Sequence, residues 1–133
     1  MPHDLIVIPR CITRKFVKAH SEWNFLWGGT HYGEIYAGQG LSCIGMSNCY
    51  KIPTKYRNCK SDSAAFFQDN HFDSTLKFII DRAFQLVPSD KSIIPFPKIG
   101  MGCAQLQSKA PGVLKYIQQK IDAIKYPNIQ YYG

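Results

Sequence analysis

The stretch that most constrains the fold is residues 91–106, KSIIPFPKIGMGCAQL, where a short apolar run leads into a glycine loop. Residues 92–96 are typical of a buried parallel strand, and Pro97 ends it because proline cannot donate to a sheet ladder. Gly100 and Gly102 follow. In an α/β sheet, loops of this kind hold ligands, since glycine lets the backbone approach closely and exposed N–H groups can bind phosphate. A simple tight turn needs the same glycines, so both interpretations stay open.

A second predicted strand also runs into a glycine loop. Residues 23–27 read WNFLW, and Gly28, Gly29 and Thr30 follow directly. Because ligands sit at the carboxyl ends of strands in open α/β sheets, we expect the backbone of residues 28–29 and of residues 100–102, Met101 included, to cradle one ligand.

Strands alternate with helices along the chain. The helix over residues 74–87, with Ser74 as its cap, shows one apolar face at helical period. This alternation predicts α/β architecture for a single domain over residues 1–133, with a mostly parallel central sheet and helices on both faces. Strands are expected at 5–8, 23–27, 48–52, 92–96 and 128–132, helices at 13–21, 38–45, 74–87 and 111–124, and loops at 53–55 and 56–70.

Composition limits the possible partners. The formal net charge of +7 suits an anionic partner such as a nucleotide, whereas the lack of a basic block argues against a nucleic-acid groove. Apolar runs are too short for a membrane span, and the first ten residues do not resemble a signal peptide, so we expect a cytoplasmic protein. Five cysteines without a CxxC pair favour neither a disulfide framework nor a zinc site, and we expect no metal and no cofactor.

Three side chains are candidates for chemistry or charge. His31, in the first glycine loop, can serve as a general acid or base near neutral pH, or can simply be exposed. Asp69 could pair with His71 in QDNHF and serve as a general acid or base, or could have no role beyond its place in a loop. Lys55, at the end of IPTK, can hold a phosphate as a point charge, or can be an ordinary solvated lysine.

The chain contains a series of short segments that form a pattern: Gly38-Gln39, Asn48 with IPTK at 52–55, FFQDNHF at 66–72, and PKIGMGCAQL at 97–106 followed by a Pro111 helix. Together they resemble a family of small bacteriophage proteins that look like compact relatives of macro domains, the α/β modules that bind ADP-ribose. The resemblance covers residues 23–124 and implies a macro-domain-like, three-layer domain. The PKIG-x-G segment is also similar to that of macro-domain phosphatases acting on ADP-ribose 1″-phosphate.

The resemblance implies an ADP-ribose-related nucleotide as the ligand. It places Gly38 and Gln39 in the site and gives Asn48 a contact with the distal ribose, although an asparagine there can also close a turn. Its natural role would be to sequester an immune signalling nucleotide in the cytoplasm of a phage host. Hydrolysis or phosphate removal on an ADP-ribose derivative, and inhibition of a protein partner, are the alternatives. Binding is favoured because Gly29 replaces the acidic residue of the family pattern.

Overall fold

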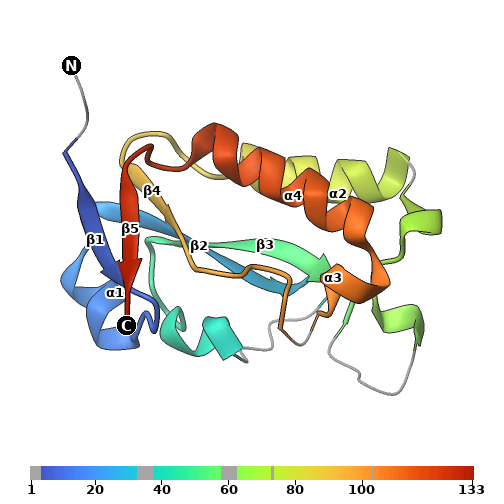
Figure 1. Cartoon of the computed structure of the whole chain (residues 1–133), viewed down its shortest axis with the longest axis horizontal. Coiled ribbons are helices and arrows are strands. Elements are labelled where there is room, and N and C mark those ends of the chain that lie inside the picture. The colour runs from blue at the N-terminus through green and yellow to red at the C-terminus, as the bar shows by residue number, and fades with distance from the viewer. Residues whose placement is uncertain (1–3, 33–37, 58–62, 73, 103) are drawn as a thin grey trace.

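The computed structural model describes residues 4–32, 38–57, 63–72, 74–102 and 104–133. Within these segments the chain alternates between short strands and helices (Figure 1). The strands are β1 (Ile6–Pro9), β2 (Trp23–Thr30), β3 (Cys49–Lys55), β4 (Ser92–Pro95) and β5 (Ile129–Tyr132). The helices are α1 (Arg14–Ala19), α2 (Ser74–Gln85), α3 (Leu106–Lys109) and α4 (Pro111–Ile124), with 3₁₀ turns at Gly38–Ser42, Ser63–Ala65 and Asp69–His71.

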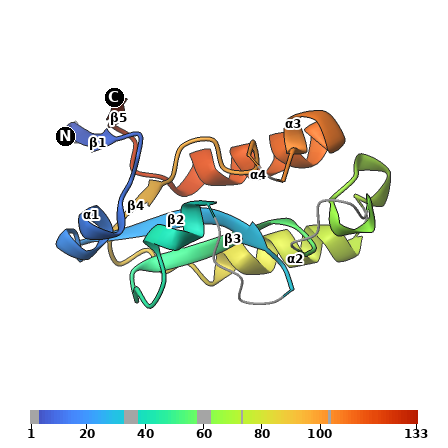
Figure 2. The ribbon, with the colours of Figure 1, turned by 90° about the horizontal axis from the view of Figure 1, so that it is seen from below.

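Every pairing between these strands is parallel. They form a three-stranded sheet in the order β3-β2-β4 and a two-stranded sheet of β1 and β5. The two sheets adjoin, since Tyr126 N donates to Ile93 O at 2.8 Å and the Tyr131 hydroxyl donates to Pro95 O. Figure 2 shows β1 and β5 side by side at one end of the molecule. The strands therefore follow the order β1-β5-β4-β2-β3 across the fold.

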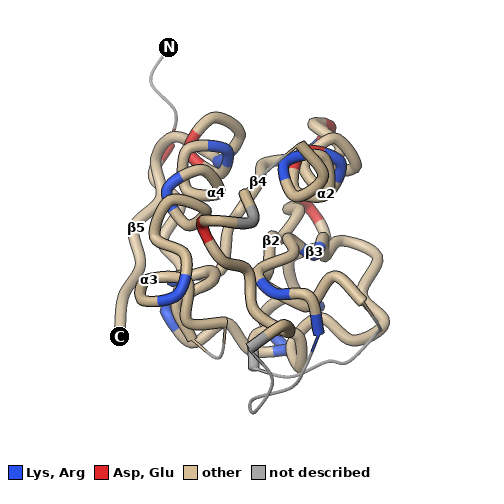
Figure 3. The backbone as a smooth tube through the Cα atoms, turned by 90° about the vertical axis from the view of Figure 1, so that its right-hand side faces the viewer, with Lys and Arg blue, Asp and Glu red and all other residues tan. Residues whose placement is uncertain are grey.

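Helices cover both faces of the strands. Figure 1 shows α2 and α4 above the strands and α1 with the Gly38–Ser42 turn below them, and Figure 3 shows α2 and α4 next to each other, seen end-on. Phe25 and Leu26 of β2 are fully buried on opposite faces, as neighbours in a strand must be. Phe25 packs edge-on against Phe16 of α1, with ring centroids 6.3 Å apart. The predicted α/β architecture, with parallel strands and helices on both faces, is confirmed.

Helix ends follow local chemistry. The Thr13 side chain accepts a hydrogen bond from Phe16 N at 3.1 Å and so caps α1, as the sequence predicted. Pro111 opens α4, where its missing N–H costs nothing. Ser74 is the first residue of α2 rather than the cap before it, and α3 was not predicted.

Two strands extend further than the sequence predicted. β2 continues through Gly28 and Gly29 to Thr30, and residues 53–55 belong to β3 rather than to a loop. Pro53 is tolerated because β3 is the outer strand of the three-stranded sheet. At Pro53 no described residue pairs with the side of β3 that faces away from β2, so a missing N–H there breaks no ladder bond. As a result, Lys55 is held by strand pairing, opposite Thr30.

Candidate functional site

The carboxyl ends of β2 and β4 form the point where the chain changes direction across the sheet. From β2 the chain passes to β3 on one side, whereas from β4 it passes through α3 and α4 to β5 on the other. The following segments also leave on opposite faces, since the Gly38–Ser42 turn and α4 lie on opposite sides of the strands (Figure 1). In open α/β sheets a ligand crevice is expected at such a switch point.

The Gln39 side chain fills the gap that opens where β2 and β4 separate. Pairing between these strands ends with Phe96 N donating to Leu26 O at 2.8 Å. Beyond it, Gln39 Oε1 accepts from Gly28 N at 2.9 Å, and Gln39 Nε2 donates to Pro97 O at 2.8 Å. The predicted ligand residue Gln39 thus has both ends of its amide occupied by the protein, and Gly38 begins the turn that presents it.

The two glycine segments meet beside Gln39. A Cβ added at Gly28 would lie 3.5 Å from Gly100 N and 3.3 Å from side-chain carbons of Ile99 and Thr54. A Cβ at Gly28 would therefore touch the backbone of Gly100 and press slightly on the two side chains, so the two segments lie in close contact. The segments after β2 and β4 thus lie together, as a shared ligand site would require; the expectation that they cradle one ligand stays a prediction.

Three of the described residues between positions 97 and 105 have a left-handed backbone. Lys98 and Gln105 have φ of 56° and 52°, and Gly100 has φ of 85°. Left-handed residues other than glycine carry backbone strain, and such strain gathers at functional sites. Within the described segments, the N–H groups of Gly100 and Gly102 donate no hydrogen bond, and Met101 N turns back to Lys98 O at 3.0 Å. Unpaired N–H groups in a loop of this type form a concavity suited to an anion.

Lys55 is the last residue of β3 and lies beside the end of β2. Its side chain belongs to a residue that is only 3% exposed. Its ammonium group has no hydrogen-bond partner among the described residues and lies 4.4 Å from the centre of the Phe66 ring. Lys109 of α3 places a second ammonium 4.5 Å from the same ring. Lys55, a predicted ligand residue, is therefore a buried cation rather than the ordinary solvated lysine that the sequence left open.

His31 and Thr30 follow directly after the glycines of β2. Burial, with a smaller contribution from the nearby Lys51 charge, lowers the pKa of His31 below its ordinary value, which favours the neutral imidazole. Thr30 is buried, and its hydroxyl donates to Tyr32 O at 3.0 Å. In the described part of the chain no carboxylate lies against His31 to orient it.

Asp69 caps a helix. Its carboxylate accepts hydrogen bonds from Gly112 N and Val113 N, both at 3.0 Å, and so satisfies the first free N–H groups of α4. The geometry gives Asp69 this capping role and supports no part for it in catalysis. The side chain of its predicted partner, His71, lies outside the described structure.

Asn48 lies at the amino end of β3, whereas the glycine segments lie at the opposite, carboxyl ends of the strands. It is buried, and its Nδ2 donates to His20 O and Trp23 O, each at 3.1 Å. These bonds hold the end of α1 against the start of β2. The contact with a distal ribose, which the family resemblance implied, gains no support from this position.

Gly29 and Trp27 serve packing. A Cβ at Gly29 would lie 2.7 Å from both the Trp27 ring and Lys51 Cδ, and one at Gly40 would lie equally close to the ring. Trp27 is buried beside these glycines and forms part of the core. Gly29 can therefore face a ligand only with its backbone.

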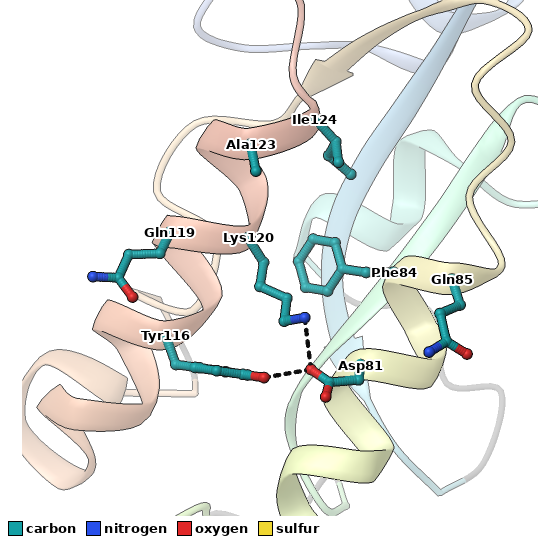
Figure 4. A pocket seen from close by; sticks show the side chains of 8 residues that line it. All are labelled: Asp81, Phe84, Gln85, Tyr116, Gln119, Lys120, Ala123 and Ile124. Atoms are coloured by element: carbon teal, nitrogen blue, oxygen red, sulfur yellow. Dashed lines mark hydrogen bonds and ion pairs between the residues drawn. The ribbon is translucent and has the colours of Figure 1, made fainter.

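A groove of about 470 Å³ lies between α2 and α4. Its charged groups pair with each other, as Figure 4 shows: Asp81 accepts from Lys120 Nζ at 2.8 Å and also from the Tyr116 hydroxyl at 2.5 Å. Hydrogen bonds from Lys120 and Tyr116 lower the pKa of Asp81. Since its charges are already satisfied, this groove offers a ligand less than the carboxyl edge of the sheet does.

Sequence reasoning missed Phe66 and Lys109. In the sequence Phe66 was only part of the predicted loop over residues 56–70, and nothing marks Lys109 as its neighbour. Both lysine ammonium groups contact the Phe66 ring, and an antiparallel bridge holds Phe66 beside Lys55. In the part of the chain that the structure describes, no three His, Cys, Asp or Glu side chains gather as metal ligands, and no helix has the length and apolar character to cross a membrane.

Comparison with known proteins identifies the family. Residues 7–120 match a family of unknown function (DUF7831), and the chain belongs to that family. No curated protein and no solved structure matches the chain.

Proposed function

We propose that this protein binds an ADP-ribose-type nucleotide at the carboxyl ends of β2 and β4, next to the Gln39 side chain that bridges them. The diphosphate would lie on the backbone of residues 28–29 and 100–102. The observation that carries the proposal is the close approach of Gly28 to Gly100 at the switch point of the sheet, where a Cβ would come within 3.5 Å of Gly100 N.

The charge and the loop geometry support an anionic ligand. The unpaired N–H groups of Gly100 and Gly102 form one side of the proposed cradle. Lys55 supplies a cation at the same edge, and Figure 3 shows further Lys and Arg positions around the ends of the strands. The net charge of +7 would also steer anions to the protein.

The role proposed is to hold the nucleotide, not to convert it. The carboxylate of Asp69 is engaged at the start of α4, and His31 has no orienting carboxylate among the described residues. By its resemblance to phage relatives of macro domains, the protein would act in the cytoplasm of a bacterial host and sequester a nucleotide signal of immunity.

A thermal-shift screen tests the proposal. The ligands are ADP-ribose, its cyclic isomers and cyclic dinucleotides. At 100 times the dissociation constant a ligand stabilises the fold by about 2.7 kcal/mol, which raises Tm by roughly 8 °C for a chain of this length. No shift with any of these nucleotides at millimolar concentration would contradict nucleotide binding and favour a protein-binding inhibitor.

Mass spectrometry of the recovered ligand separates binding from catalysis. We expect the nucleotide to be released unchanged after heat denaturation. Repeated turnover that disappears in His31→Ala would instead show an enzyme acting on an ADP-ribose derivative, with His31 as its acid or base.

A further inference from the structure

A buried ammonium group without a partner marks a second site at the carboxyl edge of the sheet. Lys55 is 3% exposed, and its Nζ makes no hydrogen bond within the described segments. Strand pairing holds the residue from both sides, because Lys55 lies opposite Thr30 in β2 and forms a bridge with Phe66. A buried charge is costly unless it is paired, so this position favours an anionic partner that the protein chain described here does not provide.

The surroundings of Lys55 add a second positive charge instead of a negative one. The Phe66 ring has Lys55 Nζ at 4.4 Å from its centre and Lys109 Nζ at 4.5 Å. Among the described residues, no Asp or Glu forms an ion pair with either lysine. Two ammonium groups in contact with one aromatic ring raise the local positive potential, and an anion bound beside them would offset it.

We propose that Lys55 and Lys109 form a binding site for a dianionic tetrahedral group, that is, a phosphate monoester or free inorganic phosphate. Two ammonium groups match a double negative charge, and lysine binds phosphate as a point charge with short hydrogen bonds. The buried Phe66 ring forms an apolar wall that limits access of water and strengthens the attraction. Binding at this site requires neither the backbone cradle of residues 100–102 nor a diphosphate.

Calorimetric titration in phosphate-free buffer tests the site. Inorganic phosphate and AMP are the probes, with adenosine as the uncharged control for AMP. We expect both probes to bind the wild-type protein and Lys55→Met or Lys109→Met each to weaken binding tenfold or more, as loss of a charge-assisted hydrogen bond implies. Tighter binding of AMP would identify a monoester as the ligand, whereas binding of phosphate alone would identify the free ion.

Lys77→Met is the matched control. Lys77 is exposed on α2, its Nζ also lies over aromatic rings, at 5.4 Å from Phe72 and 5.8 Å from Tyr116, and its loss changes the net charge equally. It should leave binding unchanged. Equal weakening in all three variants, unchanged binding in Lys109→Met, or no binding to the wild type would overturn the proposal.

The design separates this site from the nucleotide cradle. Lys109 is exposed, so Lys109→Met retains the fold even where Lys55→Met does not. Titration of ADP-ribose into the same variants shows whether the cradle works on its own. Binding of ADP-ribose with no binding of phosphate or AMP would remove the two-lysine site and leave the proposed function intact.

Discussion

Replacing Lys55 by methionine should make the unliganded protein more stable. Methionine has a similar length and fits the same apolar surroundings, but it brings no charge into a site where the ammonium has no described partner. A buried unsatisfied charge costs more than the about 1–3 kcal/mol of a neutral polar group, that is, about 3–4 kcal/mol, while a desolvated contact between a cation and a ring returns about 2 kcal/mol. The net gain on substitution is therefore about 1–2 kcal/mol, or roughly 3–6 °C in Tm.

Urea denaturation in phosphate-free buffer measures this gain in the free energy of unfolding, with the fluorescence of the two tryptophans as the signal. Lys77→Met, at an exposed position, should stay within about 0.5 kcal/mol of the wild type. Added phosphate should stabilise the wild type and not Lys55→Met, because the ligand is linked to folding only where its site exists.

The opposite result would refute the reasoning. If Lys55→Met lost about 3–5 kcal/mol, the lysine would belong to a buried ion pair within the protein, since removing one partner of such a pair leaves the other charge buried alone. The unpaired cation, and the anion site inferred from it, would then both be wrong.

Three further substitutions test individual roles. Asp69→Ala should lower the free energy of unfolding by about 1–2 kcal/mol in urea denaturation, because α4 loses its cap, and should leave ADP-ribose affinity unchanged; a loss of binding with unaltered stability would restore a functional role. Gln39→Glu should cost about 1–3 kcal/mol, since a carboxylate would face the Pro97 carbonyl, and an unchanged urea midpoint would contradict the bridge between β2 and residue 97. Because folding lowers the pKa of His31, the unfolded chain binds more protons, so stability should fall as the pH drops below about 6.5; His31→Gln should reduce that slope, and an equal slope would show that His31 does not contribute.

The fold was predictable where local patterns carry the information. The helix over 74–87 and the strand over 92–96 show strong periodicity or apolar runs, and both appear close to the predicted bounds. Pro53 misled the reading of residues 53–55, because whether a proline ends a strand depends on which side of the strand has a neighbour, and that is a tertiary property.

The site was predictable only in part. That the segments around Gly28 and Gly100 meet follows from parallel strands, and sequence reasoning anticipated it. The sequence did not predict the hydrogen-bond partners of three polar side chains, Gln39, Asn48 and Asp69. Each of these side chains bonds to a backbone group that is far away in the sequence. A polar side chain that caps a helix and one that binds a ligand look alike until its partners are known.

A glycine substitution that adds bulk without strain gives the cleanest variant for testing the cradle. Gly100 is unsuitable, because a Cβ there would lie 2.6 Å from Leu106 Cδ1 and φ is 85°, so a valine would disturb the fold itself. Gly102 has no atom within 4 Å of an added Cβ, and its φ is not in the left-handed region. Gly102→Val should therefore fold normally, and Gly102→Ala is its graded control.

Calorimetric titration of ADP-ribose into the wild type, Gly102→Ala and Gly102→Val tests the central claim most directly. The account predicts saturable binding to the wild type, a small loss for alanine, and a loss of tenfold or more for valine, whose branched side chain blocks the backbone, at equal thermal stability of all three proteins. Equal affinity for the wild type and Gly102→Val would show that the nucleotide does not lie on this loop, and no heat of binding to the wild type would contradict the proposed function.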